Sequence, residues 1–76
     1  MSVKVYSTPT CPWCIRTKQF LEENNIAFED VNVATDQAAA EEMVKKSGQM
    51  GVPVLEINGQ IIVGFDKERI KQALGT

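Results

Sequence analysis

The chain has 76 residues, 43% of them apolar, and a formal net charge of −2 at pH 7. This length allows one domain with one small core, so residues 1–76 are expected to form a single domain. The interspersed charges give no basic stripe for nucleic acid, and no apolar run approaches the ~18 residues of a membrane span.

The first predicted elements are a strand and a helix. Alternating residues with β-branched side chains predict a strand over Val3–Ser7. Pro12 suits the first turn of a helix, where a missing N–H costs nothing. This helix is expected to run to about Asn24 or Asn25, which places Cys11 at its N-cap or beside it.

The next elements complete a parallel unit and add a second helix. A strand over Phe28–Val33 would follow the first helix, and strand, helix, strand within about thirty residues is a βαβ unit. Thr35 or Asp36 is expected to cap the second helix, and Gly48 to end it. Its inward stripe is predicted to be Ala40, Met43, Val44 and Ser47.

The last third predicts a hairpin and a final helix. Val54–Ile57 and Gln60–Val63 flank Asn58-Gly59, the strongest short hairpin signal. Asp66 is expected to cap a helix that runs to about Leu74. The order β-α-β-α-β-β-α requires an α/β fold: a mixed four-stranded sheet with helices on both faces, which is the thioredoxin-type architecture.

The two cysteines carry the predicted chemistry. Cys11 and Cys14 form a CxxC pair where a strand gives way to a helix, a context typical of a reversible dithiol. Unpaired N–H groups and the helix dipole favour the thiolate of Cys11. We therefore expect Cys11 to attack disulfides and Cys14 to resolve the mixed disulfide. Half of a zinc site and two inert thiols are the alternatives; one chain without histidine cannot complete a zinc site, and no metal is expected.

Three further features are candidates for a substrate groove. Trp13 suits partner contact, although ordinary half-burial is equally compatible. In a cis turn at Val52-Pro53, the Val52 backbone could pair with an extended substrate; from the residues alone, a trans proline that starts a strand is favoured. Gly64-Phe65-Asp66 permits close backbone approach, whereas plain capping with a core phenylalanine is the simpler interpretation.

Together these motifs resemble the glutaredoxins over the whole chain. The matching segments are Cys11-Pro12-Trp13-Cys14, Gly51-Val52-Pro53 and Val63-Gly64-Phe65-Asp66. The resemblance implies a thioredoxin fold, a cis Val52-Pro53 peptide and a redox-active disulfide that reduces protein disulfides. It also implies a substrate or glutathione groove formed by Thr8, Pro12, Trp13, Val52, Pro53, Gly64, Phe65 and Asp66.

Three positions depart from the glutaredoxin pattern. Thr8 stands where the family usually has a lysine or arginine, Gly51 where it has a threonine, and Lys67 where it has an acidic residue. The chain is therefore more similar to the short glutaredoxin-like redoxins, which include the NrdH-redoxins and are typically reduced by a flavoprotein of the thioredoxin reductase type.

The expected partners follow from this resemblance. They are disulfide-containing proteins as substrates, and either glutathione or such a flavoenzyme as electron donor, with no bound cofactor and a monomeric chain. The N-terminus does not resemble a signal peptide, so a cytoplasmic location is expected. The alternatives are a glutathione-dependent iron–sulfur cluster carrier, which Pro12 disfavours by stiffening the loop, and a non-catalytic binding module.

Overall fold

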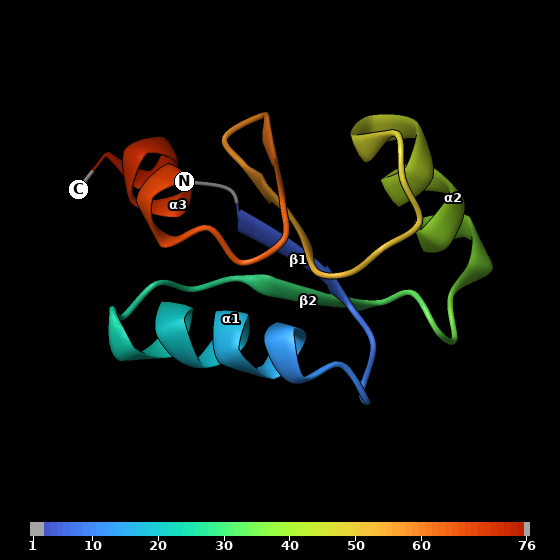
Figure 1. The fold of residues 1–76 in the computed structure, drawn as a ribbon, viewed down its shortest axis with the longest axis horizontal. Coiled ribbons are helices and arrows are strands. Elements are labelled where there is room, and N and C mark those ends of the chain that lie inside the picture. The colour runs from blue at the N-terminus through green and yellow to red at the C-terminus, as the bar shows by residue number, and fades with distance from the viewer. Residues whose placement is uncertain (1–2, 76) are drawn as a thin grey trace.

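The computed structural model describes residues 3–75, and its elements follow the predicted order (Figure 1). Met1, Ser2 and Thr76, which the predicted domain includes, lie outside the described residues. The elements are β1 (Val3–Ser7), α1 (Pro12–Glu23), β2 (Glu29–Asn32), α2 (Gln37–Ser47), β3 (Val54–Ile57), β4 (Gln60–Val63) and α3 (Lys67–Leu74).

The strands form one mixed sheet in the order β2-β1-β3-β4. β1 pairs with β2 in parallel and with β3 antiparallel, and β3 pairs antiparallel with β4. The hairpin turn holds Asn58 at φ 51° and Gly59 at φ 88°, which are the left-handed conformations that such turns require. The predicted thioredoxin-type sheet is confirmed.

Helices cover both faces of this sheet, α1 and α3 one face and α2 the other (Figure 1). Adjacent residues of a strand point to opposite faces, so Val5 belongs to the core under α1 and α3, whereas Tyr6 packs with Met43 under α2. The larger core contains Val3, Val5, Leu21, Leu55, Ile57, Ile62, Ile70 and Leu74. Because both faces are covered, the central strands β1 and β3 are buried on both sides.

A polar cluster fastens α2 to the sheet. The Tyr6 hydroxyl donates a hydrogen bond to Glu42 Oε1 at 2.7 Å. Lys46 Nζ lies 2.8 Å from the same carboxylate and 3.0 Å from Glu56 Oε2 on β3. These contacts satisfy the buried tyrosine while keeping the charges at the edge of the helix, where water still reaches them.

Two predicted details are corrected. β2 is shorter than the predicted Phe28–Val33, because it is an edge strand whose pairing with β1 ends at Ser7 opposite Asn32. On α2 the buried residues are Ala39 and Met43 rather than a stripe that begins at Ala40. Ala39 and Met43 lie four residues apart on α2 and both face the sheet. Ala40 and Val44 therefore flank this contact and are only half-buried.

Candidate active site

The chain enters α1 through Cys11, which is the N-cap of the helix. Its backbone is extended (φ −88°, ψ 113°), Pro12 occupies the first turn, and its sulfur accepts a hydrogen bond from the Cys14 N–H at 3.3 Å. Its thiol also lies 3.8 Å from the carbonyl oxygen of Val52. Cys11 is half-buried, so an incoming disulfide can reach a sulfur that already faces helix N–H groups.

Cys14 lies one turn further along α1 and is fully buried, with an exposed fraction of 0%. Burial raises the pKa of its thiol to about 11, and the side-chain hydrogen bond with Cys11 adds to the effect. At pH 7 such a group is a thiolate in only about one molecule in ten thousand. The two sulfurs are therefore unequal: one is accessible at a helix terminus, and the other is buried and protonated.

The loop before β3 lies beside this pair. The Val52-Pro53 peptide is cis, as the family resemblance implies and against what the residues alone favour. The Gly64 N–H donates to the Pro53 carbonyl at 2.9 Å, which ties this loop to the end of β4. Within residues 3–75 the Val52 N–H makes no hydrogen bond, so it is available to an extended ligand.

A groove of about 260 Å³ runs along this loop, lined by Trp13, Val52, Pro53, Gly64 and Phe65. Five of the predicted groove residues thus come together from three distant parts of the chain. The other three do not line it. Thr8 accepts a hydrogen bond from the Cys11 N–H at 3.4 Å, Pro12 forms the first turn of α1, and Asp66 caps α3 by accepting from the Arg69 N–H at 3.2 Å.

Aromatic side chains form one wall of the groove. Trp13 is 54% exposed, and its ring lies 6.3 Å from that of Phe65. Phe65 in turn packs edge-on against Phe20, with 5.7 Å between the ring centroids. The guanidinium carbon Cζ of Arg16 lies 5.1 Å from the centroid of the Trp13 ring. Trp13 is therefore both exposed and supported by neighbours. Sequence reasoning missed Phe20 and Arg16, because nothing in the local pattern shows that α1 meets the segment before α3.

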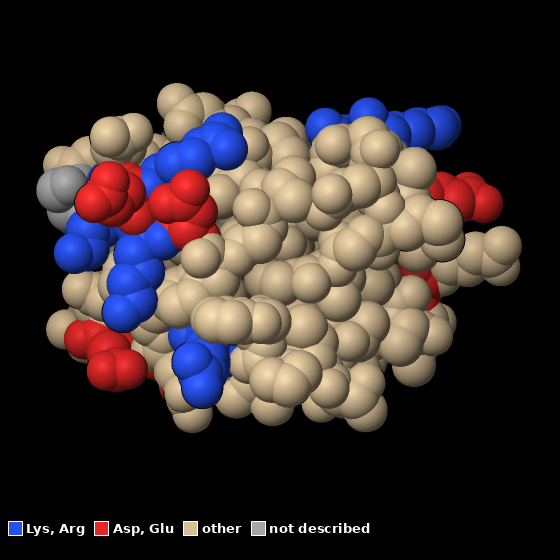
Figure 2. Space-filling view, viewed as in Figure 1, with Lys and Arg blue, Asp and Glu red and all other residues tan. Residues whose placement is uncertain are grey.

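The charges on the face shown in Figure 2 are unevenly spread. In Figure 2, charged side chains gather over α1 and α3 at the left and around α2 at the right, and the surface between them is uncharged. At the groove itself, the cations of Arg16 and Lys67 lie over the rings of Trp13 and Phe65, 5.1 and 5.7 Å from the ring centroids.

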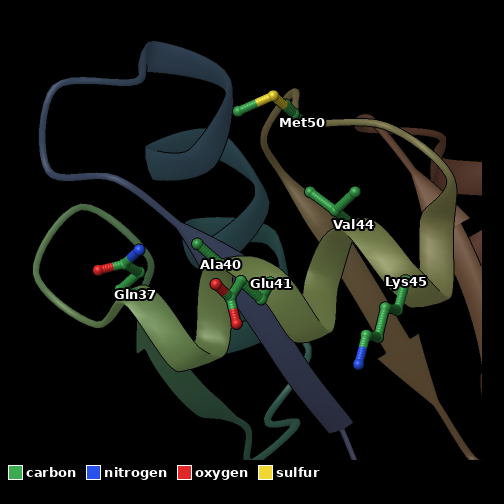
Figure 3. A pocket seen from close by; sticks show the side chains of 6 residues that line it. All are labelled: Gln37, Ala40, Glu41, Val44, Lys45 and Met50. Carbon is green, nitrogen blue, oxygen red and sulfur yellow. The ribbon is translucent and has the colours of Figure 1, made fainter.

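A separate hollow of about 420 Å³ lies on the α2 side, lined by Gln37, Ala40, Glu41, Val44, Lys45 and Met50 (Figure 3). It is larger than the groove. Neither lining includes a cysteine, but the Val52 carbonyl oxygen of the groove lies 3.8 Å from the Cys11 thiol. Five of its residues come from α2, and Met50, which is 81% exposed, comes from the loop before β3. We assign the chemistry to the smaller groove, because only the groove adjoins the thiols.

Neither a metal site nor a membrane-spanning helix is found among residues 3–75. No group of three or more histidine, cysteine, aspartate or glutamate side chains in that range is arranged to hold a metal ion. None of its helices is long and apolar enough to cross a membrane.

Comparison with known proteins adds a family and close structural neighbours. A family model described as Glutaredoxin matches residues 3–62. An uncharacterized glutaredoxin-like 8.6 kDa protein in the rubredoxin operon of Clostridium pasteurianum is 56% identical over 72 residues, which is 95% of this chain and 96% of that protein.

Two solved structures show the same fold. The glutaredoxin from Archaeoglobus fulgidus superposes with a TM-score of 0.90 and 26% identity, over 99% of this chain and 87% of that one. NrdH-redoxin from Escherichia coli, described as a glutaredoxin-like protein with a thioredoxin-like activity profile, has a TM-score of 0.85 and 28% identity, over 95% of this chain and 93% of its own.

Proposed function

The chain belongs to the glutaredoxin family of thiol–disulfide oxidoreductases, and from this premise we propose that it reduces protein disulfides through Cys11 and Cys14. The observation that carries the proposal is the inequality of the two sulfurs. Cys11 is accessible and accepts a hydrogen bond from a helix N–H, whereas Cys14 is buried beside it. Dithiol exchange needs this pairing of an attacking thiolate with a protected resolving thiol.

The reaction has two steps. The Cys11 thiolate attacks one sulfur of the partner disulfide, forms a mixed disulfide and releases the first partner thiolate, which takes up a proton. Cys14 then loses its proton and attacks Cys11 Sγ, so the Cys11–Cys14 disulfide forms and the second partner thiol leaves. The partner disulfide gains two electrons and the two cysteines lose them.

The groove explains how a polypeptide substrate would be held. An extended segment can pair with the Val52 backbone, whose N–H is unpaired within the described residues. Trp13 and Phe65 supply an apolar wall on one side, and Gly64 lets the segment come close to the backbone. The segment would then lie across the Cys11 sulfur.

For the electron donor, we favour a flavoprotein of the thioredoxin reductase type over glutathione. Thr8 lacks the cation, Gly51 the hydroxyl and Lys67 the carboxylate that glutaredoxins usually place at these positions. Tight glutathione binding would therefore lack three contacts. The dithiol must be re-reduced in order to cycle, so we place the reaction in a reducing compartment, the cytoplasm.

Trapping of the mixed disulfide tests the mechanism. Cys14→Ser is expected to accumulate a covalent complex with substrate proteins in a cell extract, which dithiothreitol releases. Cys11→Ser, the matched control, is expected to capture nothing and to lose turnover. Equal capture by both variants, or capture by neither, would refute the assigned roles.

A turnover assay tests the donor. We expect disulfide reduction coupled to a thioredoxin reductase and NADPH to be faster than reduction coupled to glutathione and its reductase, with the same substrate and protein concentration. If the glutathione system is equally fast or faster, the donor assignment is wrong while the dithiol mechanism stands.

A further inference from the structure

A polar cluster joins the active-site helix α1 to the strands β1 and β2. Ser7, at the end of β1, is 2% exposed, and its hydroxyl donates to Asp30 Oδ1 of β2 at 2.7 Å. The second oxygen of the same carboxylate, Oδ2, lies 3.1 Å from Lys18 Nζ of α1. The Lys18 side chain is 22% exposed. A long, flexible cation is thus held at one place by a carboxylate that is itself fixed by a buried hydroxyl.

The cluster is next to the resolving cysteine. Lys18 follows Cys14 by four residues on α1, so the two side chains lie on the same face of the helix, one turn apart. Within residues 3–75, the charged or titratable groups that act on Cys14 are Cys11 and Lys18, both of α1 or its cap. Thr8 contributes only its backbone, and Asp30 acts through the lysine that it holds.

This arrangement places a positive charge near Cys14, which the attack of Cys14 on the mixed disulfide requires. Cys14 must become a thiolate in a buried site, which is costly without a compensating charge. Lys18 is the cation among the groups that act on it, and its attraction to the thiolate lowers the pKa of Cys14 against the larger effect of burial. The proton leaves to solvent as the Cys11–Cys14 bond forms and the partner thiol departs.

We propose that Lys18, held in place by Asp30 and Ser7, is a positioning residue that promotes attack by Cys14 on the mixed disulfide. This inference rests on the proposed dithiol mechanism. It concerns only the second step, because Lys18 lies one turn beyond Cys14, on the far side from the helix terminus where Cys11 attacks. Neither the CxxC motif nor the groove requires this lysine.

Stopped-flow reaction with dithiodipyridine, an uncharged disulfide, separates the two steps in the intact reduced protein. Each step releases one coloured thiopyridone. The first phase depends on reagent concentration and reports attack by Cys11, and the second is independent of it and reports closure by Cys14. Lys18→Gln is compared with Lys18→Arg, which keeps the charge, and with Lys45→Gln, which removes a lysine from α2 on the opposite face of the sheet.

Lys18→Gln is expected to slow the second phase about threefold, as for the loss of a partly exposed charge pair, and to leave the first phase unchanged. Lys18→Arg and Lys45→Gln should retain the wild-type rate. Raising the ionic strength to about 1 M, where the screening length falls to about 3 Å, should slow the second phase of the wild type but not of Lys18→Gln. Lys18→Met, which keeps the aliphatic stem, replaces Lys18→Gln if that variant folds poorly.

The outcomes separate this inference from the function on which it rests. An unchanged second phase in Lys18→Gln, or a second phase in Lys18→Arg as slow as in Lys18→Gln, would overturn the role of the lysine charge. If the wild type shows no second phase, the dithiol mechanism itself fails.

Discussion

Gly64 offers a sharp test of how the groove is built. Its φ is +79°, in the left-handed region, and a Cβ placed there would meet no atom within 4 Å. The cost of Gly64→Ala therefore comes from the backbone conformation alone, about 1 kcal/mol. For a domain of this length that corresponds to a melting temperature lower by about 4–8 °C. The added methyl also narrows the groove, so the KM for a protein disulfide should rise.

Gly51→Ala, in the loop before β3, is the matched control. Gly51 does not have a left-handed φ, and its Cβ would lie 3.5 Å from Gln49 Nε2, an ordinary contact. This variant should be unchanged or stabilised by up to about 1 kcal/mol, because alanine restricts the unfolded chain. Thermal and urea unfolding of the reduced proteins, followed by circular dichroism, measures the stability of both variants. If Gly64→Ala is as stable as the wild type, or Gly51→Ala loses as much stability, the reasoning is wrong.

Three further predictions concern the core, the donor and the buried thiol. Leu21 is fully buried in the larger core, so Leu21→Ala should lower the free energy of unfolding, measured in urea, by about 3 kcal/mol. Ile15 is 45% exposed on the same helix, so Ile15→Ala should change it by less than about 0.5 kcal/mol. Similar losses in the two variants would contradict the assigned core. The triple variant Thr8→Lys, Gly51→Thr, Lys67→Asp restores the residues that glutaredoxins usually have at these positions, so it should lower the KM for glutathione. An unchanged KM would show that other residues determine which electron donor is used. The pKa of Cys14 is raised from its ordinary value near 9 to about 11, so the stability that comes from keeping this thiol protonated is complete below about pH 9 and is lost as the pH rises through about 11. Cys14→Ala should therefore lose less stability than the reduced wild type between pH 9 and 11, and parallel losses would refute the buried, protonated thiol.

Local signals in the sequence predicted much of the fold. The order of strands and helices, the Asn58-Gly59 hairpin and the Asp66 cap depend on residues within a few positions of one another. Such short-range preferences act wherever the segment lies, because caps and tight turns satisfy their own backbone groups. The boundaries of β2 could not be predicted in this way, since an edge strand ends where its partner does.

The chemistry of the cysteine pair was also local. Cys11 at the N-cap and Cys14 one turn inside α1 follow from Pro12 and the helix that begins there. The burial of Cys14 follows as well, because Thr17 and Leu21 continue its face along α1 and all three are buried. These features are properties of one helix, so the sequence was sufficient for them.

Only the tertiary structure decided what surrounds the pair. The meeting of Trp13 with Phe65, the groove along Val52, and the cluster that joins Ser7 and Asp30 to Lys18 bring together residues far apart in the chain. They depend on parallel pairing of β1 with β2 and on how the segment after β4 returns to α1. By itself the sequence determined a dithiol at a helix terminus. The groove, and the anchoring of Lys18 by Asp30 and Ser7, were decided by long-range packing, for which no local pattern codes.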